Sequence, residues 1–114
     1  MSGTAKAKPK SVPLEKTIVN SIMRALKNAG VSWLFKTHGG PFQSKGIPDI
    51  ICIAPDSGRF VGIEVKRPGL GRLTELQASQ IRRIEKGGGI AGVAFDVEGA
   101  LRLLDAANRQ KGAR

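Results

Sequence analysis

Three charged side chains, Asp49, Glu64 and Lys66, stand in apolar surroundings and could act together chemically. Glu64 and Lys66 are two positions apart in an apolar run over residues 59–66, and because side chains alternate across a strand they lie on one face. Asp49 follows a proline in a second apolar run, over residues 46–54. A short turn rich in Pro, Asp, Ser and Gly joins the two runs. If the runs pair as a hairpin, Asp49 lies beside Glu64 and Lys66.

Two carboxylates and one ammonium group at a single point suit a divalent cation such as Mg²⁺ or Mn²⁺, because these ions prefer oxygen ligands. The lysine can orient a water molecule beside the ion or help to deprotonate it. The alternative is a structural ion pair, or three solvated charges on an exposed sheet face. Burying charge without a partner is costly. The proline–aspartate step, the tight turn and the E-x-K sequence occur together, so the pattern favours the metal site.

The segments that carry these residues resemble the VRR-NUC domain of the PD-(D/E)XK nuclease superfamily. The resemblance rests on the series G-x-P-D, E-x-K and Q, which is found in Gly46–Asp49, Gly58–Lys66 and Gly71–Gln77. It extends over residues 13–97, most of the chain. It implies a restriction-endonuclease-like core and metal-dependent hydrolysis of phosphodiesters.

The resemblance also implies roles for individual residues. The ion is held by Asp49, Glu64 and the backbone carbonyl of Val65, Lys66 acts on the water or the developing charge, and Glu15 and Gln77 complete the shell, Glu15 directly or through water. From the residues alone, Glu15 is a carboxylate in the first turn of a helix, where it favours the helix dipole. Gln77, likewise, could be a neutral amide on a helix surface. Both readings stay open at this point.

By its size, the chain resembles the free-standing VRR-NUC proteins of viral or bacterial type, which are similar to Holliday-junction resolvases that act as homodimers. The expected function is therefore a metal-dependent, structure-specific DNA endonuclease, with a four-way junction as the favoured substrate. A four-way junction is roughly two-fold symmetric and needs two paired cuts, which a C2 dimer supplies. The alternatives are a flap or nicked-duplex nuclease of the same fold, and a non-catalytic DNA-binding module.

The remaining sequence predicts the elements that must position this site. They are a helix from Pro13 to a cap at Gly30, a strand over 31–36, the two strands above, a helix over 74–86 capped by Thr74, a strand over 90–97 and a helix over 98–107. The first helix carries an apolar stripe of Leu14, Ile18, Ile22, Ala25, Leu26 and Ala29, and the second one of Leu73, Leu76, Ile81 and Ile84. The order is αβββαβα, an α/β fold with a mixed four-stranded sheet. Its first three strands form an antiparallel meander, and the strand–helix–strand step makes the last pair parallel.

Several basic residues are candidates for contact with nucleic acid. His38 and Lys45 lie in the loop that leads to Asp49, Arg67 and Arg72 follow Lys66, and Arg82 and Arg83 share a side of the second helix. The alternative for each is an ordinary polar or solvated surface residue. The pair Gly39-Gly40 lacks the spacing and the lysine–hydroxyl pair of a phosphate-binding loop, so no nucleotide cofactor is expected.

The composition narrows the class of protein. The net charge is +10, of which residues 1–10 and residues 102–114 each contribute +3, so a polyanionic partner is expected. We expect a basic arm over residues 1–11, a nuclease domain over 12–108 and a basic tail over 109–114.

Few aromatic side chains are expected at the surface, which favours recognition of the backbone and shape of DNA over reading of its bases. The single cysteine, Cys52, lies in an apolar strand, and no apolar stretch approaches a membrane span. A cytoplasmic location, in a bacterium or an infected host cell, fits best.

Overall fold

The computed structural model describes residues 11–41 and 44–109. Its elements are α1 (Glu15–Asn28), β1 (Leu34–Lys36), β2 (Ile50–Ile53), β3 (Phe60–Val65), α2 (Glu75–Lys86), β4 (Ile90–Ala94) and α3 (Val97–Arg109). The predicted αβββαβα order is confirmed. The predicted arm over 1–11 and the tail over 109–114 lie almost wholly outside the described residues.

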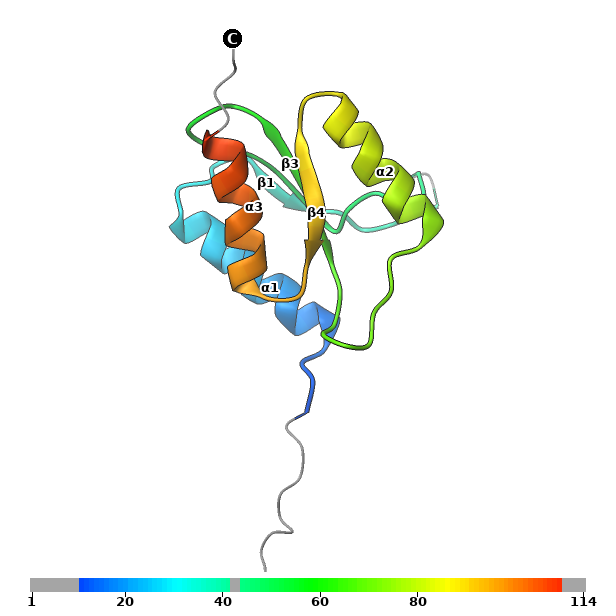
Figure 1. Cartoon of the computed structure of the whole chain (residues 1–114). Coiled ribbons are helices and arrows are strands. Elements are labelled where there is room, and N and C mark those ends of the chain that lie inside the picture. The colour runs from blue at the N-terminus through cyan, green and yellow to red at the C-terminus, as the bar shows by residue number, and fades with distance from the viewer. Residues whose placement is uncertain (1–10, 42–43, 110–114) are drawn as a thin grey trace, which may run out of the picture.

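The strands form one mixed sheet in the order β1-β2-β3-β4 (Figure 1). β1 pairs antiparallel with β2, and β2 pairs antiparallel with β3. β3 and β4 run parallel, as the helix between them predicted. The two strands that carry the chemical residues are therefore the central ones, and the register sets Ile50 of β2 opposite Ile63 of β3.

Helices cover both faces of the sheet, and the face between α1, α3 and the sheet holds the core. The buried residues there come from α1, from alternate positions of β2 and β3, and from α3: Ile18, Val19, Ile22, Leu26, Ile50, Cys52, Val61, Ile63, Val65, Ala100, Leu104 and Ala107. Leu103 of α3 approaches β4 at Gly92, where an added Cβ would lie 3.0 Å from its Cδ2. The predicted alternation of β3, with its valine and isoleucine side chains in the core and Glu64 on the other face, is confirmed.

Several predicted boundaries were wrong. α1 begins at Glu15 and not at Pro13, and Leu14 is 62% exposed, so it is no part of the buried stripe. β1 has three residues instead of six, since the chain from Val31 enters it only at Leu34. β4 ends at Ala94, because the side chain of Asp96 accepts a hydrogen bond from the Gly99 amide at 2.8 Å and starts α3 there.

The other face of the sheet is covered by α2, which packs more lightly than predicted. No residue of α2 is fully buried, and Leu73 and Leu76, predicted to face the core, are 41% and 54% exposed. Ile84 makes the close approach: an added Cβ at Gly62 would lie 3.0 Å from its Cδ1. A glycine in the middle of β3 therefore lets α2 lie against the sheet.

Aromatic side chains are more exposed than the sequence predicted. Trp33 and Phe35, at and beside the edge strand β1, are 45% and 52% exposed and stack edge to face with ring centroids 4.8 Å apart. Phe95, just after β4, is 44% exposed. The expectation of few exposed aromatics was wrong, because an edge strand has a neighbour on one side only and its outer side chains stay uncovered.

Candidate active site

The start of β2 and the end of β3 bring Asp49 and Glu64 together. The register that pairs Ile50 with Ile63 sets Asp49 next to Glu64. Asp49 Oδ2 accepts a hydrogen bond of 2.8 Å from the Val65 amide, which fixes its carboxylate against β3. Thr37 secures the same point from the other side, since its Oγ1 donates to the Pro48 carbonyl at 2.8 Å. The predicted proximity of the two carboxylates is confirmed, whereas the anchoring by Thr37 was not predicted.

Among the residues that the structure describes, Glu64 is the one charged residue that is buried, with 3% of its surface exposed. Its two oxygens have different surroundings. Oε2 accepts a hydrogen bond of 2.8 Å from Gln77 Nε2 and lies 3.7 Å from Lys66 Nζ. Oε1 is buried and, within the described residues, no hydrogen-bond donor reaches it. A buried carboxylate oxygen without a partner is costly, so this atom calls for a ligand.

The surroundings of Glu64 disfavour its charged form. The pKa of Glu64 is raised from 4.5 to about 8, chiefly by burial and then by the negative charge of Asp49, a hydrogen bond with the Asp49 side chain and the charge of Glu15. Lys66 opposes these effects and lowers the pKa. Without a cation, a protonated Glu64 can share its hydrogen with Asp49. A cation bound between the two carboxylates would take the place of that proton and would satisfy the charged form of Glu64.

Gln77 enters the site from the first turn of α2. Thr74 caps the helix: its Oγ1 accepts from the Gln77 amide at 3.1 Å, and Gln77 Oε1 accepts from the Thr74 amide at 3.0 Å. The remaining group of the Gln77 side chain, Nε2, reaches Glu64. The predicted N-cap at Thr74 is confirmed, and Gln77 contacts Glu64 directly.

Glu15 and Arg67 meet the site at the start of α1. Glu15 is the first residue of α1 and is exposed, yet it lies near enough to Glu64 to raise the pKa of that carboxyl. Arg67 donates from Nε to the Pro13 carbonyl at 2.9 Å and from Nη2 to the Val12 carbonyl at 3.0 Å. Much of the Arg67 guanidinium is thus engaged in tying α1 to the end of β3. We expected Arg67 to contact DNA, and this second role was not predicted.

The side chains of this site can supply some of the ligands of a divalent cation, but not a complete coordination shell. Within residues 11–41 and 44–109, no three His, Cys, Asp or Glu side chains gather closely enough to hold a metal ion. Asp49 and Glu64 are the pair of carboxylates available, and the unpartnered Glu64 Oε1 is the atom that an ion would satisfy. The rest of the shell of a hexacoordinate ion would come from water, the substrate and the backbone, as is usual for Mg²⁺.

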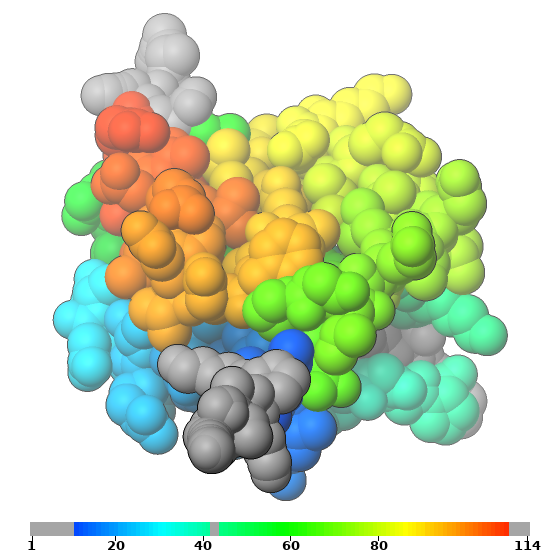
Figure 2. All heavy atoms as spheres, turned by 60° about the horizontal axis from the view of Figure 1, so that its bottom comes forward, coloured from blue at the N-terminus to red at the C-terminus, as the bar shows by residue number. Residues whose placement is uncertain are grey.

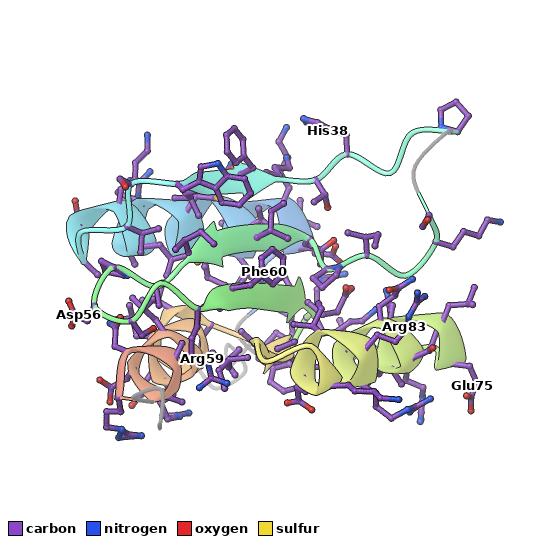
Figure 3. The ribbon with its side chains drawn as sticks, turned by 90° about the horizontal axis from the view of Figure 1, so that it is seen from above. His38, Asp56, Arg59, Phe60, Glu75 and Arg83 are labelled. Atoms are coloured by element: carbon purple, nitrogen blue, oxygen red, sulfur yellow. The ribbon has the colours of Figure 1, made fainter. Side chains whose placement is uncertain are left out.

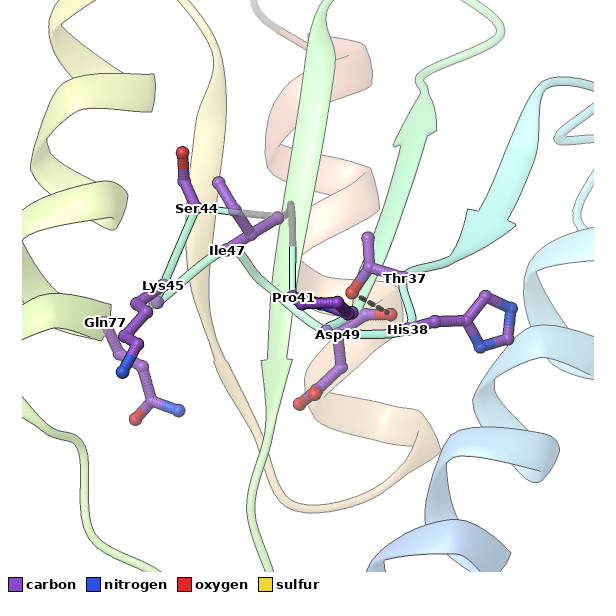
Figure 4. Close-up of a pocket in the computed structure, with 11 residues that line it drawn as sticks. Thr37, His38, Pro41, Ser44, Lys45, Ile47, Asp49 and Gln77 are labelled. Atoms are coloured by element: carbon purple, nitrogen blue, oxygen red, sulfur yellow. Dashed lines mark hydrogen bonds between the residues drawn. The ribbon is translucent and has the colours of Figure 1, made fainter.

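A cavity of about 430 Å³ opens beside Asp49, between the loop after β1 and α2. Figure 4 shows Lys45 and Gln77 on one side of it and Thr37 and Asp49 on the other. His38 also lines the cavity, but its ring points away from Asp49 (Figure 4). The predicted proximity of this loop to the site is confirmed.

The other predicted cations lie at the surface. Arg72 is exposed in the segment that follows β3, which Figure 2 shows in green between the start of α1 in blue and α2 in yellow-green. Arg82 and Arg83 are exposed on α2, and Figure 3 shows Arg83 projecting from that helix while His38 projects from the loop after β1.

In the described ranges, no helix is long and apolar enough to cross a membrane.

Comparison with known proteins shows the family of the chain. No curated protein matches the chain. A solved structure described as a VRR_NUC domain protein is similar, with a TM-score of 0.70 over 85% of this chain and 89% of that chain, at 20% sequence identity. That identity is low, so the likeness speaks for the fold. A model of the VRR-NUC domain family matches residues 14–96, which include all five residues of the site. The chain therefore belongs to the VRR-NUC domain family, a family of nucleases.

Proposed function

We propose that the protein is a Mg²⁺- or Mn²⁺-dependent endonuclease that hydrolyses DNA phosphodiesters. One observation carries this proposal: Glu64 Oε1 is buried without a donor in a residue that lies next to a second carboxylate, Asp49, and whose other oxygen is 3.7 Å from Lys66 Nζ. A bound cation would satisfy the buried oxygen and both carboxylates, whereas a structural ion pair with Lys66 does not need the second carboxylate.

Each residue of the site has a task in this proposal. Asp49 and Glu64 would hold the ion, with the Val65 carbonyl and, through water, Glu15 as further ligands. A bound divalent ion polarises the scissile phosphate and lowers the pKa of a coordinated water. Lys66 Nζ, 3.7 Å from Glu64, can orient the attacking water and stabilise the charge that develops on the phosphate. Gln77 holds Glu64 in place.

The proposed substrate is branched DNA, with a four-way junction favoured and a homodimer as the active form. Lys45, Arg72, Arg82 and Arg83 are exposed and suit contact with phosphates, and Lys45 lines the cavity beside Asp49. The exposed pair Trp33 and Phe35 at the sheet edge offers an apolar surface that a second copy could cover. Two sites related by a two-fold axis would match the symmetry of the junction.

A cleavage panel tests the proposal. The purified protein is incubated with a four-way junction, a flap, a splayed duplex and a linear duplex, each with Mg²⁺, with Mn²⁺ or with excess chelator. We expect paired nicks in the junction that require the ion and disappear in E64A and K66A. Glu85 is an exposed carboxylate of α2, so E85Q is the matched control and should cleave normally.

The outcomes of the panel separate the alternatives. Preference for the flap would make the protein a flap nuclease of the same fold. Binding to DNA that is unaffected by Mg²⁺, with no cleavage of any substrate, would make it a non-catalytic binding module. Equal cleavage in chelator would refute the metal-dependent reaction.

Light scattering of the wild type and of F35E tests the proposed homodimer. A charge on the edge strand should prevent a second copy from covering it, so F35E should be a monomer.

A further inference from the structure

We propose that Thr74 is a positioning residue of the active site, which acts through Gln77 on Glu64. The inference rests on the proposed function and deepens it. Thr74 does not touch the carboxylates itself. It forms both hydrogen bonds of a capping box with Gln77, at 3.0 and 3.1 Å, and Gln77 in turn donates to Glu64 at 2.8 Å.

The capping box decides which way the Gln77 amide faces. A glutamine side chain has one acceptor oxygen and one donor nitrogen. Because Oε1 is taken by the Thr74 amide, Nε2 is left to face Glu64 Oε2. The flipped amide would set its oxygen against the carboxylate and its NH₂ group against a backbone N–H, and both contacts would be repulsive. A helix cap thus selects the donor that the buried carboxylate needs.

The position of Gln77 depends on such local bonds because α2 is weakly buried. No residue of α2 is fully buried, so packing alone does not fix the start of the helix. Two other contacts hold this end: Gln80 Nε2 donates to the Lys45 carbonyl at 3.3 Å, and the backbone at Gly46 comes so close that an added Cβ would lie 2.5 Å from the Leu76 carbonyl oxygen. The Thr74 backbone amide is the contact that holds the Gln77 side chain itself, and the Thr74 hydroxyl keeps the two residues in reach of each other by accepting from the Gln77 backbone amide.

This orientation also directs the other oxygen of Glu64. With Oε2 held by Gln77 and near Lys66, Oε1 is the oxygen that remains available to a cation. Loss of the Thr74 hydroxyl would free the first turn and allow the Gln77 amide to rotate. Glu64 would then lose a charge-assisted hydrogen bond that fixes its rotamer.

A double-mutant cycle tests the inference, with single-turnover cleavage of the four-way junction and urea unfolding measured on the same proteins. T74A should cleave about tenfold more slowly, the loss expected from one misplaced hydrogen bond to a charged group. T74S keeps the hydroxyl and should cleave like the wild type. In the Q77A background, T74A should cause no further slowing, because the residue through which Thr74 acts is gone. T17A, at an exposed threonine of α1, is the matched control.

Urea unfolding distinguishes the positioning role of Thr74 from its role as a helix cap. The Thr74 hydroxyl accepts from the backbone amide of residue 77, so T74A should lower the urea midpoint in both backgrounds. Equal slowing by T74A with and without Gln77, or slowing by T74S, would overturn the inference.

A spectroscopic measurement keeps the inference independent of cleavage. The ¹⁵N side-chain amide signal of Gln77 should be shifted and slow to exchange in wild type and T74S, and should resemble a free amide in T74A. If the wild type cleaves no DNA, the proposed nuclease function fails, and this signal still decides whether Thr74 orients Gln77. An unchanged signal in T74A would refute the positioning role whatever the cleavage result.

Discussion

Replacing Glu64 by glutamine should change the way in which the stability of the metal-free protein depends on pH. Burial and the neighbouring Asp49 raise the pKa of Glu64 from 4.5 to about 8. Between these values the folded protein holds a proton that the unfolded chain releases. E64Q has the same shape and no proton to lose, so it removes this difference.

The sign and size of the effect follow from linkage. Where the folded state binds more protons than the unfolded state, the free energy of unfolding falls as pH rises. A single group contributes a slope of about 1.4 kcal/mol per pH unit. The contribution of Glu64 is fully present below pH 4.5 and is lost as pH approaches about 8. The wild type should therefore lose stability relative to E64Q over this window, by a few kcal/mol in total.

Urea unfolding followed by tryptophan fluorescence measures the difference. Wild type, E64Q and the exposed control E85Q are unfolded at pH 5, 6, 7 and 8 in the presence of chelator. We expect E64Q to gain on the wild type at each step, so that it is the more stable protein at pH 8. E85Q should run parallel to the wild type. D49N removes the neighbouring charge and should reduce the slope, since Asp49 is the second cause of the raised pKa.

A constant difference between wild type and E64Q from pH 5 to pH 8 would refute the reasoning, because Glu64 would then titrate alike in the folded and unfolded states. Addition of Mg²⁺ at pH 8 supplies a second check. A ligand that binds only the folded state stabilises it by mass action. Mg²⁺ should raise the urea midpoint of the wild type and leave that of E64Q nearly unchanged.

Three further predictions concern the framework of the site. G46A should destabilise the protein by roughly 3 kcal/mol in urea unfolding, because position 46 has a φ of +83° and its new methyl group would strike the α2 backbone, whereas G58A, with a φ of +78° and open space, should cost about 1 kcal/mol. Cys52 is buried and its pKa is raised to about 11 by that burial, so a thiol reagent at pH 8 should label it only after unfolding; rapid labelling of the native protein would contradict this. R67A removes the bonds that tie the start of α1 to the site, so amide exchange in the first turn of α1 should quicken while R24A, in the same helix, leaves it unchanged.

The sequence by itself determined the features that depend on local pattern. The alternation of apolar and charged residues in β3 fixed which face carries Glu64 and Lys66, because the strand period is two whatever the strand packs against. Thr74 was recognisable as a cap three residues before Gln77, since a capping box needs only neighbouring residues. The central hairpin followed from the short turn between β2 and β3, and the parallel last pair followed from the helix between β3 and β4.

The tertiary structure decided where elements end and how much each one buries. Leu14 continues the apolar pattern of α1, yet the helix begins one residue later and nothing covers that side chain. Val97 looked like the end of a strand, but the Asp96 side chain captures the Gly99 amide and turns the chain into α3. α2 looked as amphipathic as α1 but buries no residue fully. Burial depends on which surfaces meet, and periodicity along one segment does not specify that.

The chemistry of the site divides in the same way. The types and spacing of four residues marked them as candidates: Asp49, Glu64, Lys66 and Gln77. No sequence pattern, however, distinguished the surroundings of one from those of another. Only the folded chain places Glu64 where one oxygen is held by Gln77 and the other is buried without a partner. The shift of the Glu64 pKa arises from desolvation and from a carboxylate fifteen positions away in the sequence, and both exist only when β2 and β3 pair. The sequence thus supplied the groups, and the pairing of two strands made one of them a candidate metal ligand.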